Sequence, residues 1–291
     1  MTRNLPASIQ ARLLNRARER GEDFNRTLTS FAIERFLYRL SLLPARDSLW
    51  LKGARLFDLW FDVPHRATAD ADFLGFGPSS VAEAVQTIRT ICLQTAEDGM
   101  VYDPESITAL AIREEIRQGG LRIRLTGMLG TTRCPIQLDI GFGDAVTPGP
   151  EDVMYPTLLD DLPGPRLKAY PRETVVAEKL EAMTSLGMIN SRMKDYFDLR
   201  ALVLEERLND ADLPRALHAT FTRRGTPIPS STPLGLSDAF AQDPQKLSQW
   251  KAFLNRNRLA PIDLADVVSE LRDAFQDAFK RALALHSDQD S

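Results

Sequence analysis

Apolar residues in the first forty positions recur at the spacing of helices. Those on one expected helical face are Leu28, Phe31, Ala32, Phe36 and Leu40. Residues three or four apart share a face of an α-helix, so the pattern predicts a helix that is buried along one side. Gly21 interrupts this region, and Pro44 stops it. We therefore expect two helices between Ser8 and Leu43.

The middle of the chain changes to two-residue alternation, which indicates strands. The expected strands span 49–51, 70–74, 108–116, 121–128 and 135–142, and residues 118–120 are expected to join two of them as a hairpin. Helices are expected at 54–61 and, after a cap at Ser79-Ser80, as far as about Thr95.

Prolines gather between Pro148 and Pro171, which predicts a connecting segment at 151–171. Beyond it, helical spacing predicts helices at 172–186, 193–206, 212–223, 244–255 and 262–285. The order of elements predicts an α+β protein with a helical N-terminal lead. A small mixed sheet with flanking helices would occupy a domain at 1–165, and a helical domain would occupy 166–291.

Composition narrows the class of protein. The net charge of −4 is not that of a general DNA-coating protein. Cys92 and Cys134 lie far apart, which argues against a zinc site and a disulfide framework. No apolar run approaches the ~20 residues that span a membrane, so we expect a cytoplasmic protein without membrane contact. The first expected helix carries Arg12, Arg16, Arg18 and Arg20. Such a cluster is ordinarily a solvated face, and the alternative is contact with RNA phosphates.

Asp70 and Asp72 lie two residues apart on an expected strand, so both side chains point to the same face. Ala71 and Phe73 point to the other face, into a core. Two adjacent carboxylates repel each other unless a cation lies between them, and hard oxygen ligands suit Mg²⁺. The pair indicates a metal site, and a solvated strand edge is the alternative.

Asp139 adds a third carboxylate. On the strand at 135–142 it shares a face with Gln137 and Gly141, while the other face is apolar. Three carboxylates on two strands can hold two metal ions, which activate an attacking oxygen and stabilise a leaving phosphate. The alternative for Asp139 is a structural aspartate satisfied by hydrogen bonds.

Charged residues also fall on the apolar faces of two expected helices. Lys179 projects into an apolar stripe, where it needs an anionic partner. That partner is either a triphosphate or the carboxylate of a structural salt bridge. Asp195 lies among apolar residues of the next helix, on which Lys194 and Asp198 have the spacing of a helix-supporting pair.

A turn at Lys52-Gly53-Ala54 separates an expected strand from an expected helix. The free N–H groups at the start of a helix can bind phosphate. A tight turn without a ligand accounts for a single glycine equally well.

Together these motifs resemble those of the AbiEii-type nucleotidyltransferases, the toxins of abortive-infection and type IV toxin–antitoxin systems. The matching segments are Lys52–Leu56 (KGARL), Arg66–Phe73 (RATADADF), Gln137–Asp144 (QLDIGFGD), Ala177–Ala182 (AEKLEA) and Asn190–Leu199 (NSRMKDYFDL). They follow the family's order over roughly residues 49–199. The chain departs from the family at Ala54, where a second Gly or a Ser is usual and a serine would donate its hydroxyl to phosphate.

The resemblance implies a nucleotidyltransferase fold and transfer of a nucleoside monophosphate from an NTP. Asp70 and Asp72 would bind Mg²⁺, as two ions, together with the NTP. Asp139 would be the third acid, a metal ligand or a base toward the acceptor hydroxyl. Lys179 would hold the triphosphate, and Asp195 would orient Lys179 or a substrate group.

The resemblance also places Lys52, Gly53, Arg66 and Thr68 in the nucleotide phosphate pocket. It implies that the acceptor is the 3′ end of tRNA, so that translation is blocked, and that a cognate antitoxin is a further partner. The arginines of the first helix and Arg223-Arg224 would contact RNA phosphates. Two alternatives remain, namely transfer to a protein or small molecule, and a module that binds NTP without catalysis.

Overall fold

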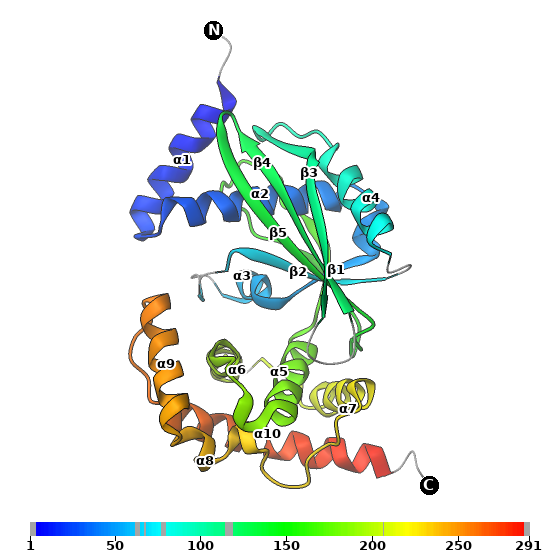
Figure 1. Cartoon of the computed structure of the whole chain (residues 1–291), viewed down its shortest axis with the longest axis vertical. Helices are drawn as coiled ribbons and strands as arrows, with labels where there is room; N and C mark the ends of the chain where they lie inside the picture. The colour runs from blue at the N-terminus through cyan, green and yellow to red at the C-terminus, as the bar shows by residue number, and fades with distance from the viewer. Residues whose placement is uncertain are drawn as a thin grey trace. The chain divides into compact units, whose positions relative to one another are not determined.

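The chain forms two compact units (Figure 1). The computed structural model describes residues 4–61, 65–66, 68–76, 80–113, 119–205 and 207–287. The first unit comprises Met1–Gly143 and Glu151–Ala169, and the second comprises Asp144–Pro150 and Tyr170–Ser291. The second unit therefore begins after residue 169, where the sequence pattern suggests 165, and it also takes up the segment 144–150.

A mixed sheet is the centre of the first unit, as the sequence predicts. The strands described are β1 (Leu49–Lys52), β2 (Asp70–Gly75), β3 (Met100–Arg113), β4 (Gly119–Leu129), β5 (Thr132–Phe142), β6 (Glu151–Met154) and β7 (Arg166–Ala169). They lie in the order β3-β4-β5-β2-β1-β7-β6. Strand β2 pairs parallel with β5 and antiparallel with β1, so two strands that are distant in sequence meet at the middle of the sheet.

Helices cover one face of this sheet. The helical elements of the first unit are α1 (Leu5–Arg20), α2 (Phe24–Ser41), α3 (Phe57–Trp60), α4 (Val81–Cys92) and two 3₁₀ turns at Pro44–Asp47 and Gly53–Leu56. Helices α2 and α4 pack against the strands and against each other (Figure 1). The buried side chains Ala71, Phe73 and Leu138 point toward them. Because strand side chains alternate, Asp70, Asp72 and Asp139 lie on the opposite face of the sheet.

Local signals account for where these helices begin and end. Asn4, Asp23 and Ser80 each accept a hydrogen bond from a backbone N–H in the first turn of the helix that follows. Gly21 ends α1 with a positive φ of 66°, a conformation that glycine adopts without strain. The expected break near Gly21 and the expected cap at Ser80 are therefore confirmed; Ser79 lies outside the described residues.

Two expectations for the sheet are wrong. The expected connecting segment at 151–171 contains the strands β6 and β7, and their four residues each are too few to establish an alternation. Strand β3 begins at Met100 and not at residue 108, because a register shift between Asp103 and Thr108 breaks its alternation. Of the residues 118–120 that are expected to join β3 and β4, residue 118 lies outside the described residues, and Gly119 and Gly120 begin β4, which pairs antiparallel with β3.

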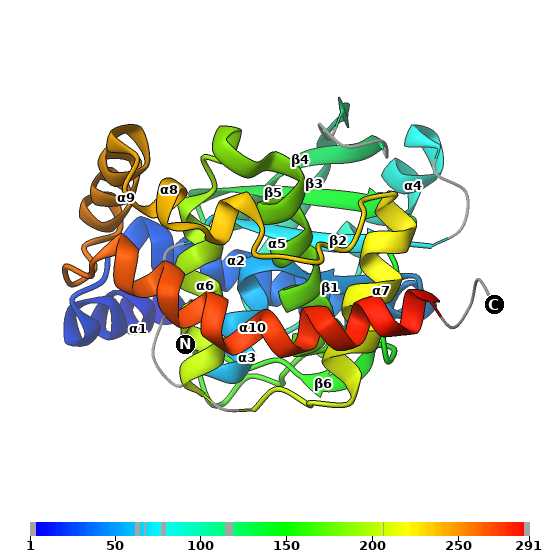
Figure 2. The same cartoon turned by 90° about the horizontal axis from the view of Figure 1, so that it is seen from below.

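The second unit is helical. Its elements are α5 (Arg172–Leu186), α6 (Met193–Leu204), α7 (Asp212–Arg224), α8 (Asp238–Ala241), α9 (Pro244–Asn257), α10 (Leu264–Ser287) and 3₁₀ turns at Gly187–Ile189 and Leu234–Leu236. The long helix α10 contacts α7 and α6 (Figure 2), and α5 contacts α7. Among the described residues, no helix is both long enough and apolar enough to cross a membrane.

Candidate active site

A row of charged residues crosses four neighbouring strands of the sheet. It lies on the face opposite to the one that helices α2 and α4 cover, which is called the open face below. Lys52 pairs with Asp72 across β1 and β2, Asp72 with Asp139 across β2 and β5, and Asp139 with Arg122 across β5 and β4. Residues directly opposite each other on paired strands share a face, and neighbouring strands lie about 4.8 Å apart. The register therefore places two carboxylates side by side between two cations.

Asp70 completes a group of three acids. Asp70, Asp72 and Asp139 each offer a carboxylate oxygen within 4.8 Å of the others, and all three are half-buried. A cluster of hard oxygen donors at this spacing fits Mg²⁺ in its chemistry. The residues that the sequence selects as metal ligands are thus brought together by the β2–β5 pairing.

The turn at Gly53 fixes the position of Asp72. Gly53 has a φ of 73°, and a Cβ atom there would lie 2.7 Å from Asp72 Cγ and 2.9 Å from Asp72 Cβ. Such distances are shorter than van der Waals contact, so only glycine allows the carboxylate to lie against this turn. Ala54, which follows, lies inside the 3₁₀ turn.

Two side chains hold Asp70. The Thr68 hydroxyl donates a hydrogen bond of 2.8 Å to Asp70 Oδ1, and Arg55 Nε donates one of 2.9 Å to the Asp70 carbonyl. Burial lowers the pKa of the Arg55 guanidinium, but nearby Tyr155 and Asp58 outweigh this and raise it. Arg55 is fully enclosed, and the sequence gives no sign of its contact with Asp70 because the contact depends on the tertiary fold. Arg66 is half-buried.

Arg122 holds the third acid. Its Nε donates to Asp139 Oδ1 at 2.9 Å and its Nη2 donates to Asp139 Oδ2 at 2.7 Å. The hydrogen bonds to Asp139 are the main reason why the pKa of Arg122 is raised, and Asp70 and Asp72 add to the effect. Asp139 is therefore satisfied by hydrogen bonds, as the structural alternative expects, and is also a member of the acidic cluster.

Lys179 and Asp195 belong to a second charged cluster, within the helical unit. Lys179 Nζ donates to Asp195 Oδ1 at 2.7 Å and to Asp198 Oδ2 at 2.9 Å, and both carboxylates are fully buried. Burial lowers the pKa of Lys179, but the two aspartates outweigh this and raise it. The salt-bridge partner expected for Lys179 is thus present. Asp198, expected only to support its helix, is one of the two acceptors.

Arg192 is the exposed part of this second cluster. Its Nε donates to Asp195 Oδ2 at 2.6 Å, while half of its side chain remains accessible to solvent. Burial raises the pKa of Asp195, but Lys179 and Arg192 outweigh this and lower it. The second cluster thus contains two cations, on Lys179 and Arg192, and two carboxylates, on Asp195 and Asp198. Arg192 carries the more accessible of the two cations. Arg192 lies in the segment Asn190–Leu199 that resembles the family, but the spacing of apolar residues in this segment does not mark it as a functional residue.

The arginines expected to contact RNA lie in different surroundings. Arg224 forms ion pairs with Asp144, Glu178 and Glu181. Burial lowers the pKa of Arg224, but these carboxylates outweigh this and raise it. The charge of Arg224 is therefore balanced within the helical unit. Arg223 is exposed.

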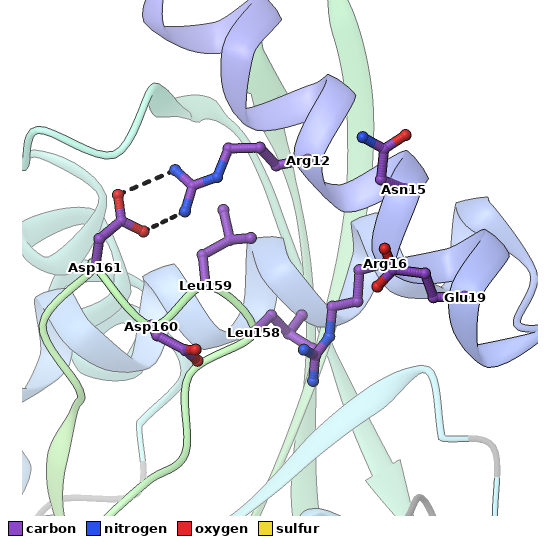
Figure 3. Close-up of a pocket in the computed structure, with 8 residues that line it drawn as sticks. All are labelled: Arg12, Asn15, Arg16, Glu19, Leu158, Leu159, Asp160 and Asp161. Atoms are coloured by element: carbon purple, nitrogen blue, oxygen red, sulfur yellow. Dashed lines mark hydrogen bonds and ion pairs between the residues drawn. The ribbon is translucent and has the colours of Figure 1, made fainter.

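Helix α1 and the loop after β6 line a surface pocket of about 410 Å³ (Figure 3). Arg12 points at Asp161 and forms two hydrogen bonds with it, while Arg16 reaches past Leu158. Asp160 also lines the pocket, so cations and anions are mixed there. Arg18 and Arg20 remain exposed farther along the helix.

A sequence model for the AbiEii family, described as the nucleotidyl transferase AbiEii toxin of type IV toxin–antitoxin systems, matches residues 35–283. The chain belongs to the AbiEii family. This match includes both charged clusters, and membership implies NTP as a substrate and a cognate antitoxin as a partner. A search of curated proteins gave no match.

One solved structure shares the fold of this AbiEii-family chain, and a second is similar to it. The crystal structure of JHP933 from Helicobacter pylori is 16% identical, with 91% of this chain and 95% of the other covered and a TM-score of 0.50. A second Helicobacter pylori structure, described as a candidate nucleotidyltransferase, is 16% identical, with 88% and 96% covered and a TM-score of 0.48. At this identity JHP933 supports the nucleotidyltransferase fold alone.

Proposed function

We propose that this AbiEii-family protein is a Mg²⁺-dependent nucleotidyltransferase that transfers a nucleoside monophosphate from an NTP to the 3′ end of tRNA and so blocks translation. The observation that carries the proposal is the register of β2 and β5, which brings Asp70, Asp72 and Asp139 within 4.8 Å of one another on the open face of the sheet. Family membership and the exposed side chains of Arg18, Arg20 and Arg223 support RNA as the acceptor.

Asp70, Asp72 and Asp139 are the residues that hold Mg²⁺ in this proposal, as two ions. The bound metal supplies Lewis acidity, which activates the attacking hydroxyl and stabilises the leaving pyrophosphate. Thr68 and Arg55 keep Asp70 in place, and Gly53 lets Asp72 lie against the turn. The open face of the sheet leaves these oxygens accessible to substrate.

The phosphate-binding role proposed for the second cluster belongs to Lys179 and Arg192. An ammonium has three N–H donors, and two of those on Lys179 already reach Asp195 and Asp198. The remaining donor is directed to a triphosphate oxygen. Arg192 adds a guanidinium that Asp195 orients through Nε, so its terminal nitrogens are preorganised for phosphate. Within the first unit, Lys52, Gly53 and Arg66 are the residues proposed to contact phosphate beside the acids.

The decisive experiment measures transfer of label from each α-³²P NTP to purified tRNA with Mg²⁺. The wild type is compared with Asp72→Asn and with Gln137→Ala, a control on the same face of the neighbouring strand. We expect label from a preferred NTP at the tRNA 3′ end, retained in the control and lost in Asp72→Asn.

Two outcomes contradict parts of the proposal. Label on protein or on a small molecule, but not on tRNA, keeps the chemistry and rejects the acceptor. NTP binding without transfer to any acceptor rejects the enzyme and favours a binding module.

A variant with Arg16, Arg18 and Arg20 replaced by Glu tests the proposed RNA contact of the first helix separately. Unchanged transfer to tRNA by this variant would show that the helix does not contact the RNA.

A further inference from the structure

Two arginine–aspartate forks in the first unit, Arg39–Asp98 and Arg122–Asp139, differ in how strongly they are enclosed. Arg39 and Asp98 are almost completely buried, and Arg39 also donates to three backbone carbonyls. Arg122 has about a third of its side chain exposed, and its only hydrogen-bond acceptor among the described residues is Asp139. The first fork is locked by its surroundings, whereas the second lies on the open face and can exchange its partner.

Arg122 occupies the position where a counter-ion for the acidic cluster is needed. Three carboxylates whose oxygens lie within 4.8 Å repel one another in the absence of a cation. Arg122 donates to both oxygens of Asp139, and Asp70 and Asp72 also act on its charge. In the metal-free protein the guanidinium thus contributes, with Lys52 on the other side of the row, positive charge that offsets the repulsion among the three acids.

The contact between Arg122 and Asp139 also disfavours the binding of a metal ion by Asp139. A divalent cation held by Asp139 would be close to the guanidinium, and like charges close together repel each other. A nucleoside triphosphate brings negative charge to the same place, and a guanidinium binds phosphate with the geometry that it uses for a carboxylate.

We propose that Arg122 is an exchangeable counter-ion, which holds Asp139 in the metal-free protein and exchanges that carboxylate for a phosphate group of the bound nucleotide. The inference rests on the proposed function, since it takes Asp139 to be a metal ligand. It makes the metal and the nucleotide bind cooperatively, because the nucleotide removes the cation that competes with the metal.

The test measures binding of Mn²⁺ to the purified full-length protein by electron paramagnetic resonance, without nucleotide. The variants are Arg122→Gln, Arg122→Lys, Asp139→Asn and the control Arg124→Gln. Arg124 lies on the same strand and face, where it donates to Gln137 at 3.2 Å. A neighbouring arginine ordinarily shifts proton binding to a carboxylate by about ten- to a thousandfold. We therefore expect Arg122→Gln to tighten Mn²⁺ binding by roughly tenfold or more.

Arg122→Lys keeps the charge but loses the fork, so we expect a smaller gain in Mn²⁺ affinity and the control to match the wild type. We further expect Arg122→Gln to lower the transfer rate and to lose the increase in Mn²⁺ affinity that the wild type shows with a non-hydrolysable NTP. A gain in Mn²⁺ affinity together with a loss in transfer rate distinguishes an exchangeable counter-ion from a merely structural pair.

Each other result has a definite meaning. Unchanged or weaker Mn²⁺ binding in Arg122→Gln than in the control overturns the inference, while weaker binding in Asp139→Asn leaves the proposed function standing. Equal Mn²⁺ binding by wild type and Asp139→Asn removes the metal site and overturns both. Should Arg122→Gln fail to fold by circular dichroism, a gain in affinity in Arg122→Lys decides for the inference, and no gain decides against it.

Discussion

Replacing Gly53 with alanine tests how closely the position of Asp72 depends on the turn beside it. The new Cβ would lie 2.7 Å from Asp72 Cγ, whereas carbon atoms in contact are about 3.5–4.0 Å apart. Asp72 must therefore move by roughly 1 Å, and a misplacement of that size at a reacting centre costs about a hundredfold in rate. Alanine at the positive φ adds about 1–2 kcal/mol of backbone strain.

Gly21→Ala is the matched control. Gly21 has a φ of 66°, close to that of Gly53, but a Cβ there meets nothing within 4 Å. Both variants should lose similar stability in urea unfolding. Only Gly53→Ala should lose Mn²⁺ affinity, by about 10–100-fold, as when a group that supports a metal ligand is changed. It should also lose about a hundredfold in nucleotide transfer.

The result that refutes this reasoning is simple to recognise. If Gly53→Ala binds Mn²⁺ and transfers label as well as Gly21→Ala does, Asp72 is not held by the turn. A loss of Mn²⁺ affinity in both variants would instead trace the effect to backbone strain and general destabilisation.

Three further predictions concern stability. Burial raises the pKa of Glu34 to about 7 from 4.5, so its stabilising protonated form is present below pH 4.5 and is lost as the pH rises through 7. Glu34→Gln should abolish a fall of roughly 3 kcal/mol in the free energy of unfolding across that range, and an unchanged fall would refute this. Lys179→Met removes the cation that lies between two fully buried carboxylates, although Arg192 still contacts Asp195, and it should cost about 3–5 kcal/mol in urea unfolding, with replacement of both aspartates by asparagine restoring stability but not transfer. A Cβ on Gly235 would lie 2.5 Å from the Met183 carbonyl oxygen, so Gly235→Ala should cost about 1–3 kcal/mol, whereas Gly119→Ala, which meets nothing, should not.

Elements with strong periodicity could be predicted from the sequence. The helix at 172–186 is found with the expected bounds, and the strands at 70–74 and 135–142 carry their acids on the expected face. Strands β6 and β7 escape prediction because each has only four residues, among prolines, which are too few to establish a period. The same limit applies to the start of β3, where a bulge moves the side chains out of alternation.

The partners of the site residues were harder to predict, for two different reasons. The contact of Arg122 with Asp139 follows from the two-residue turn Gly130-Thr131, which sets the register of β4 against β5, so the signal for it is present in the sequence. The hydrogen bond from Arg55 to the Asp70 backbone has no such signal, since it depends on how a 3₁₀ turn packs against β2.

The parallel pairing of β2 with β5 also bears on when the protein becomes active during its synthesis. Strands that are distant in sequence close a long loop before they gain any contact energy, so such pairing is slow and completes late in folding. Asp139 joins Asp72 only through this pairing, and β7 must reach β1 before the sheet is complete. A nascent chain that has left the ribosome only as far as β2 therefore carries two of the three acids of the cluster and lacks Asp139. For a member of a toxin family, this order of assembly delays completion of the acidic cluster until nearly the whole first unit has emerged.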